Sequence, residues 1–163
     1  VVLQDVPVRI LSPTQLAACG EPQTELVVGL SLPHPILKSL YLKADRLKAL
    51  DNHVRITLSL AEVSHLILEV RNESVNIHTT FGNLSRARPE SLQASMDEKD
   101  INAVVDSRQL SRSLFGYHAM SFQLQSSQLS AFIFLWRTCV MLHFPFESQG
   151  GYIAFYIPLV IGD

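Results

Sequence analysis

The sequence predicts an α+β domain in which antiparallel sheets carry two helices on one face. Apolar residues recur at helical spacing in two short segments and alternate with polar residues over most of the rest. These segments follow one another as strand, helix and three strands, twice over. At 163 residues, 47% hydrophobic and 17% charged, the chain has enough apolar side chains for one core and lacks the composition of a disordered protein.

The first unit opens with a strand and a helix. Glu25 to Leu32 is mostly apolar, and Pro33-His34-Pro35 ends this strand and places proline where a helix tolerates it. A helix is predicted over Ile36 to Leu50, because apolar residues recur there every three or four positions. The residues on its core side are Ile36, Leu37, Leu40, Tyr41, Ala44 and Leu47.

Three strands follow, and their apolar residues alternate with polar ones. These strands cover His53 to Leu60, Leu66 to Val70, and Val75 to Phe81. The links between them suit hairpins and are too short for crossovers, so we expect an antiparallel meander. Ser85 to Asp100 is charged and poor in apolar residues, which predicts a mobile loop.

The second unit repeats this order of elements. Asp106-Ser107 offers helix caps after a strand over Ile101 to Val105, and a helix is predicted from Arg108 to about His118. Ser121 to Ser130 is rich in Ser and Gln, and its secondary structure is ambiguous. The last strands are predicted over Ala131 to Trp136, Val140 to Phe146, and Tyr152 to Ile157, with a turn at Gly150-Gly151.

Two further segments precede these units. Val1 to Leu11 alternates apolar and polar residues and predicts a strand, whereas Ser12 to Gln23 contains two prolines and Gly20 and predicts a connector. The first residues differ from a secretion signal, and a start without Met suggests a piece of a longer protein. The longest apolar tract, Ala131 to Phe146, is interrupted by polar and charged residues, so no membrane contact is predicted.

Positive charge is concentrated in the two predicted helices. The segments Pro35 to Leu50 and Ser107 to His118 hold 28 of the 163 residues but 6 of the 13 basic ones, with Asp45 as their single acid. Their net charge is +5, and that of the remainder is −7. Because the whole chain has a net charge of −2 and a pI near 6.3, an overall basic nucleic-acid binder is excluded, and any basic surface is local.

Two interpretations of these cations stay open: they solvate exposed helix faces, or they form a surface for phosphates. On a helical wheel five of them lie away from the apolar side, namely Lys38, Lys43, Arg46, Arg108 and Arg112. No aromatic residue is seen to interleave with them. We therefore expect any nucleic-acid contact to be with the backbone, without base stacking or groove recognition.

No motif for catalysis, a metal or a cofactor is found. The chain lacks a glycine-rich phosphate loop, a Gly-x-Ser-x-Gly elbow, cysteines paired at metal spacing and a His-x-x-x-His pair. We therefore predict a protein that is not an enzyme and uses no metal or cofactor, with an active site of scattered residues as the open alternative. Cys19 and Cys139 lie 120 positions apart, which favours a reducing compartment, the cytosol or the nucleus.

Three short strings resemble a known family. They are Gln4 to Ile10 (QDVPVRI), His78 to Phe81 (HTTF) followed by Asn83-Leu84, and Ala154 to Pro158 (AFYIP). With the repeated order of elements, they resemble the Hus-one subunits of the nine-one-one DNA-damage checkpoint clamp, which belong to the DNA sliding-clamp (PCNA-like) superfamily. In that fold, helices line a central hole and sheets form the outer wall.

The resemblance implies a domain organisation and a function. Residues 1–11 would be the last strand of a preceding clamp domain, residues 12–23 the interdomain connector, and residues 24–163 the carboxy-terminal clamp domain. The chain would be a nuclear subunit of a heterotrimeric ring, with two other clamp subunits, that encircles double-stranded DNA without sequence preference. Such a ring is opened by an ATP-driven clamp loader, marks DNA damage, and recruits checkpoint and repair proteins.

The resemblance also implies the site residues. The positions that line the hole carry over to Lys38, Lys43, Arg46, Arg108 and Arg112, the cations that the wheel places outward. The edge strand that pairs with a neighbouring subunit would contain Val75, Ile77, Thr79 and Phe81. The part of the connector that receives partner proteins would contain Leu16, Ala17 and Ala18.

Two other functions stay open. A replicative processivity clamp of the same fold would form a homotrimer. A β-rich protein-interaction or ligand-binding domain would stay monomeric and would not bind DNA at any salt concentration.

Overall fold

Three helices and eight strands make up the described part of the chain. The structure is a computed structural model that describes residues 12–18, 26–59, 63–87, 100–124, 130–146 and 151–160. A short helix α1 (Pro13–Ala18) precedes the first unit, which consists of β1 (Leu26–Leu32), α2 (His34–Leu47), β2 (His53–Ser59), β3 (Ser64–Arg71) and β4 (Asn76–Leu84). The second unit consists of β5 (Ile101–Asp106), α3 (Ser107–Leu124), β6 (Ala131–Trp136), β7 (Cys139–Phe146) and β8 (Gly151–Pro158). The predicted α+β class and the repeated order of strand, helix and three strands are confirmed.

The strands form two antiparallel four-stranded sheets, in the orders β4-β3-β2-β5 and β1-β6-β7-β8. The last three strands of each unit form an antiparallel meander, but the first strand of each unit joins the sheet of the other unit. β1 pairs with β6, where Leu30 lies opposite Ile133, and β5 pairs with β2, where Val105 lies opposite Val54. This exchange joins the two units into one domain, and it is a feature that the sequence pattern did not predict.

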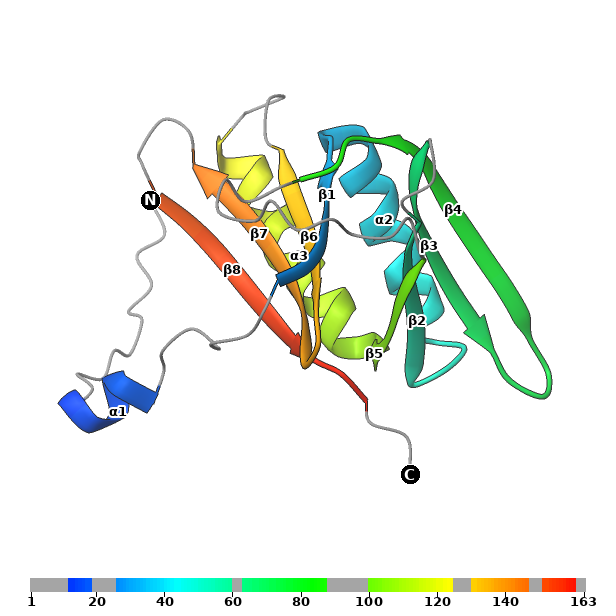
Figure 1. Ribbon diagram of the computed structural model, residues 1–163, viewed down its shortest axis with the longest axis horizontal. Helices are drawn as coiled ribbons and strands as arrows, with labels where there is room; N and C mark the ends of the chain where they lie inside the picture. The colour runs from blue at the N-terminus through cyan, green and yellow to red at the C-terminus, as the bar shows by residue number, and fades with distance from the viewer. Residues whose placement is uncertain are drawn as a thin grey trace, which may run out of the picture.

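The chain that leaves each meander crosses to the other sheet and covers one of its edges. After β4, the Ala87 N–H donates to the Gly29 carbonyl over 2.9 Å, so this segment pairs with β1. After β8, the Val160 N–H donates to the Val104 carbonyl over 2.8 Å, so this segment pairs with β5. β4 and β8 remain at opposite ends of the layer of strands (Figure 1), and neither has an outer strand partner among the described residues.

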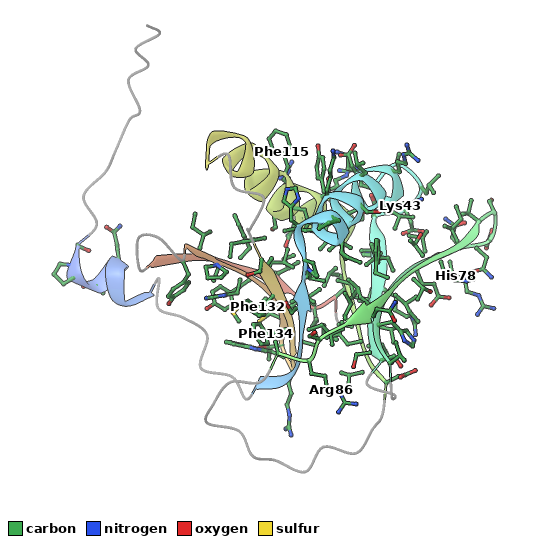
Figure 2. All side chains as sticks on the ribbon, turned by 90° about the horizontal axis from the view of Figure 1, so that it is seen from above. Lys43, His78, Arg86, Phe115, Phe132 and Phe134 are labelled. Carbon is green, nitrogen blue, oxygen red and sulfur yellow. The ribbon has the colours of Figure 1, made fainter. Side chains whose placement is uncertain are left out.

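The core lies between the inner faces of the sheets and the inner sides of α2 and α3. Burial alternates along β3 and β6: in β6, Ala131, Ile133 and Leu135 are buried while the residues between them are not. Figure 2 shows both helices on one side of the molecule, with the sheets beneath them. The buried residues of α2 are Leu37, Leu40, Ala44 and Leu47. Each large apolar side chain that is fully buried contributes about 1.5–3 kcal/mol, so this contact holds the helix on the sheets.

The helices begin at residues that satisfy or remove free backbone N–H groups. Asp106 caps α3, because its Oδ1 accepts from the N–H groups of Arg108 and Gln109 over 2.9 and 2.8 Å. This is one of the predicted caps. In α2, Pro33 and Pro35 stand at the start, where their missing N–H groups cost nothing.

The structure contains helical residues in two places where the sequence analysis predicted none. α1 begins at a capping box inside the predicted connector: Ser12 Oγ accepts from the Gln15 N–H over 3.3 Å, and Gln15 Oε1 accepts from the Ser12 N–H over 3.1 Å. α3 ends at Leu124 and so includes the first part of the ambiguous segment 121–130. The predicted strand 1–11, most of the predicted loop 85–100 and the turn before Gly151 lie outside the described residues.

A hydrogen-bonded junction fixes the ends of both long helices to one sheet. The Ser107 hydroxyl donates to the Asp51 carbonyl over 2.6 Å, which joins the start of α3 to the segment after α2. Asn72 Nδ2 donates to Asp51 Oδ2 over 3.1 Å, which adds the β3–β4 turn. The His53 N–H and, secondarily, the Asn72 amide stabilise the Asp51 carboxylate and hold its pKa below the ordinary value.

Candidate DNA-facing surface and outer faces

Basic side chains lie on the sides of α2 and α3 that face away from the sheets. Because Leu110 and Leu114 fill the inner side of α3, Arg108 and Arg112 are left on its outer side. α2 is arranged in the same way. We call the outer side of both helices the helical surface. The five predicted cations are all exposed on it: Lys38, Lys43, Arg46, Arg108 and Arg112.

These five cations lack counter-charges among the described residues. None of their side chains makes a hydrogen bond or an ion pair with any residue that the structure describes. The acid of α2, Asp45, is instead bound by the Lys48 ammonium and by the Ser111 hydroxyl, whose Oγ lies 3.1 Å from Oδ1. The bond from Lys48 is the main reason that the pKa of Asp45 is below its ordinary value. The helical surface therefore carries positive charge that the described residues do not neutralise.

One expectation about this surface is wrong, because an aromatic residue does lie among the cations. Phe115 of α3 is 56% exposed, and its ring centroid lies 6.2 Å from that of Tyr41 on α2. Figure 2 shows Phe115 pointing away from the sheets, on the same side of the molecule as Lys43. The signal was available in the sequence: Phe115 follows Arg112 by three positions and Arg108 by seven, which is the spacing of one helix face.

The predicted ring-contact strand, β4, lies at the edge of its sheet. Ile77 is 39% exposed and Thr79 is half-buried, whereas Phe81 is 6% exposed and belongs to the core. Val75 is half-buried and precedes the strand. Phe81 would therefore take part in a strand-to-strand contact through its backbone. Figure 2 shows His78 on β4 at the far end of the molecule from β8. Pairing with another subunit stays a prediction.

The predicted docking residues Leu16, Ala17 and Ala18 form the last part of α1. Their backbone is helical, and their side chains lie outside the described part of the chain. The structure thus places these residues on a helical turn and leaves their role as a prediction.

A second outer surface is aromatic, and the sequence analysis did not identify it. On the side of the β1-β6-β7-β8 sheet that faces away from the core, the rings of Trp136 and Tyr156 lie 5.6 Å apart, and those of His143 and Tyr152 lie 4.8 Å apart. We call this side the aromatic face. It contains Phe132, Phe134, Trp136, His143, Tyr152 and Tyr156. The signal was the run of β6, in which every second residue is aromatic and the residues between are aliphatic.

Phe134 is seated on this face by a glycine of the neighbouring strand. Gly29 of β1 lies opposite Phe134 in the sheet register. A Cβ added at Gly29 would lie 2.2 Å from the Phe134 ring, so only glycine leaves room for it.

The corresponding side of the other sheet is polar. It carries an open hollow of about 320 Å³ lined by Asp51, His53, Arg55, Glu69, Arg71 and Val104. Arg55 Nε lies 3.8 Å from Glu69 Oε2, so a basic and an acidic side chain face each other here. We call this side the polar sheet face.

The described residues offer little for metal or redox chemistry. They contain no group of three metal-ligating His, Cys, Asp or Glu side chains. Cys139 is buried in β7, where burial raises the pKa of its thiol and makes it unreactive. Within the same residues, no helix is long and apolar enough to cross a membrane.

Comparison with known proteins assigns the chain to a family. No curated protein matches the sequence. The family model described as Hus1-like protein matches residues 1–161, almost the whole chain. This family has the PCNA-like clamp fold, with which the two antiparallel sheets and their helices agree. Its members are non-catalytic subunits of the DNA-damage checkpoint clamp and act in a complex with clamp partners. From the match and the fold together, the chain belongs to the Hus1-like protein family.

Proposed function

We propose that the chain is a subunit of a heterotrimeric checkpoint clamp that encircles double-stranded DNA in the nucleus. The ring would mark damaged DNA and recruit checkpoint and repair proteins, and the chain itself would catalyse no reaction. The observation that carries the proposal is the helical surface, where five exposed cations face solvent without partners among the described residues.

Electrostatics gives this surface a role that suits a sliding ring. Unpaired Lys and Arg side chains attract phosphates by charge and carry no information about base sequence. The attraction extends over a Debye length of about 8–10 Å at physiological salt, so the duplex can be held without fixed contacts. In a ring whose helices face inward, Lys38, Lys43, Arg46, Arg108 and Arg112 would therefore line the hole.

The sheet edges supply a means of building the ring. Along its outer side β4 has no strand partner among the described residues, so its backbone N–H and C=O groups can pair with a strand of a neighbouring subunit. The exposed Ile77 adds apolar contact at the same edge. Two different neighbours would complete a heterotrimer, and a clamp loader would open one such contact.

Recruitment of other proteins needs a surface on the outside of the ring. The aromatic face is on the sheet side of the molecule, away from the helical surface, and aromatic side chains are the residues that most often anchor protein partners. The connector residues Leu16, Ala17 and Ala18 are the second docking candidate. The aromatic face would remain accessible while the helices face DNA.

The native mass of the full chain tests the assembly. The chain is co-expressed with the two other subunits of the checkpoint clamp, and the complex is sized by light scattering on a sizing column. The proposal predicts a one-to-one-to-one complex that forms only when both partners are present. A homotrimer of the chain alone would replace the checkpoint function by a replicative one. A monomer in every mixture would leave a β-rich interaction domain without a ring.

A further inference from the structure

We infer that the helical surface also binds single-stranded DNA, through stacking of an unpaired base on Phe115. The inference rests on the proposed function, in which this surface faces DNA, and adds a second kind of DNA ligand. A duplex is held by the cations alone, whereas a single strand gains an aromatic contact.

Phe115 is held in an exposed position. It is the most exposed large apolar side chain among the described residues, at 56%. The neighbouring ring of Tyr41, 6.2 Å away and tilted by 44°, supports it from one side. Leu42, 48% exposed, follows Tyr41 on the outer side of α2. The two helices thus present a small apolar area, with a ring available on its outer side.

Positive charge surrounds this area. Arg112 lies one helical turn before Phe115 on the same side of α3. On α2, Lys38 and Arg46 each lie one turn from Leu42, in opposite directions along the helix. A ligand that covers Phe115 therefore meets cations on several sides, and the acid of α2, Asp45, is already bound by Lys48 and Ser111. Cations around an exposed ring favour a ligand that carries several negative charges and also has a flat apolar group.

A single strand meets this requirement better than a duplex does. In a duplex the bases are stacked on one another, and a side chain on the outside meets phosphates and sugars. An unpaired base has a free π face, and proteins that bind single strands combine basic surfaces with aromatic rings for this reason. The stacking adds affinity for any base, since every base has such a face.

Fluorescence anisotropy tests the inference on the full chain, alone and in the assembled ring. The probes are a labelled oligo(dT) of about 20 nucleotides, longer than the roughly 4–16 nucleotides that a single-strand site covers, and a labelled duplex of about the same length. Phe115→Ala should weaken binding of the oligo(dT) about 5-fold or more. Binding of the duplex should change less than about 2-fold, since the cations are intact.

Three further variants control for folding and for apolar area. Phe115→Leu keeps an apolar side chain without the ring and should lose the same affinity for the oligo(dT), while Phe115→Trp should retain it. Val63→Ala removes an exposed apolar residue, 54% exposed, between β2 and β3, and should leave both affinities unchanged. Thermal melting by circular dichroism shows whether each variant is folded.

The outcomes separate this inference from the proposed function. Selective loss of oligo(dT) binding in the Ala and Leu variants supports the inference. Equal oligo(dT) binding by the wild type and by both variants, with duplex binding intact, overturns it and leaves the DNA-facing surface standing. If neither probe binds the wild-type ring at any salt concentration, the proposed function fails and the inference fails with it.

Discussion

The helical surface and the polar sheet face both carry basic side chains, but their electrostatic surroundings differ. On the polar sheet face, Arg55 lies opposite Glu69, and both His53 and Arg71 share a hollow with Asp51. On the helical surface, five cations have no partner among the described residues, and Asp45 is bound by Lys48 and Ser111. On the polar sheet face an arginine and a glutamate face each other, whereas the five cations of the helical surface have no such counter-charge among the described residues.

This comparison shows why the number of cations says little about DNA binding. An arginine that already faces a carboxylate gains little from a phosphate, because it must give up one anion for another. Exposed ion pairs also contribute only about 0–1 kcal/mol to stability, so the charged side chains of either surface contribute little to folding. Substitutions on the two surfaces should therefore differ in their effect on DNA and agree in their small effect on stability.

Charge reversal on the helices should give the largest effect. Changing Lys38, Arg46, Arg108 and Arg112 to Glu should weaken duplex binding by about 100-fold or more near 50 mM salt, because each lost phosphate contact also removes counterion release. The affinity of the assembled ring for a labelled duplex is measured against salt concentration, and the slope should become smaller.

A matched pair of double variants sharpens that test. Arg108→Glu with Arg112→Glu should weaken duplex binding strongly, whereas Arg55→Glu with Arg71→Glu on the polar sheet face should change it less than about 3-fold, the loss expected from net charge alone. Equal losses in the two double variants would show that total charge, and not the helical surface, holds DNA.

The aromatic face gives the largest expected effect on stability. Gly29→Ala should destabilise the chain by about 1–3 kcal/mol, because a Cβ there would lie 2.2 Å from the Phe134 ring and that ring must move. Gly82→Ala is the control, since no atom lies within 4 Å of the added Cβ. Urea unfolding compares the two. Similar unfolding midpoints would mean that Phe134 relaxes freely and that the aromatic face is not tightly packed.

Removing the cap of α3 should have a smaller effect. Asp106→Ala leaves the N–H groups of Arg108 and Gln109 without their acceptor and should cost about 1 kcal/mol. Asp100→Ala removes an exposed acid that precedes β5 and should cost much less. Both are measured by urea unfolding. An Asp106→Ala variant as stable as wild type would show that the start of α3 is held by Ser107 instead.

The smallest effect concerns pH. Because the pKa of Asp51 is lower in the folded chain than its ordinary value, its carboxylate contributes stability that is present above the unfolded pKa. That contribution is lost as the pH falls from about 4 through the folded pKa. Asp51→Asn should therefore make unfolding less dependent on pH in this acidic range. If the stability of Asp51→Asn falls with acid as steeply as that of the wild type, other carboxyl groups cause the loss of stability.

The sequence predicted most of the elements that a local pattern decides. A period of two located β2, β3 and β4, because alternate residues face the core, and Asp106 was identified as a cap because its side chain acts within one turn. Helical spacing also predicted which side chains of α2 and α3 face outward, because residues three or four positions apart share one side of a helix. These features depend on neighbours within a few residues.

Features that depend on distant contacts were not predicted. The exchange of β1 and β5 between sheets is set by packing between units, and no local pattern encodes it. Helical spacing places Phe115 on the side of Arg112, but the contact of its ring with Tyr41 of α2 depends on the packing of the two helices and could not be predicted. The capping box of Ser12 and Gln15 was readable, but two prolines and Gly20 nearby favoured a connector.

Topological retention on DNA tests the central claim most directly. The assembled ring is loaded by its clamp loader onto a nicked circular DNA, and the bound fraction is measured in high salt before and after the circle is cut. The account predicts that the ring stays on the circle, because high salt removes only the electrostatic contacts, and that cutting releases it. Equal loss from circular and linear DNA would contradict an encircling clamp and would leave simple surface binding.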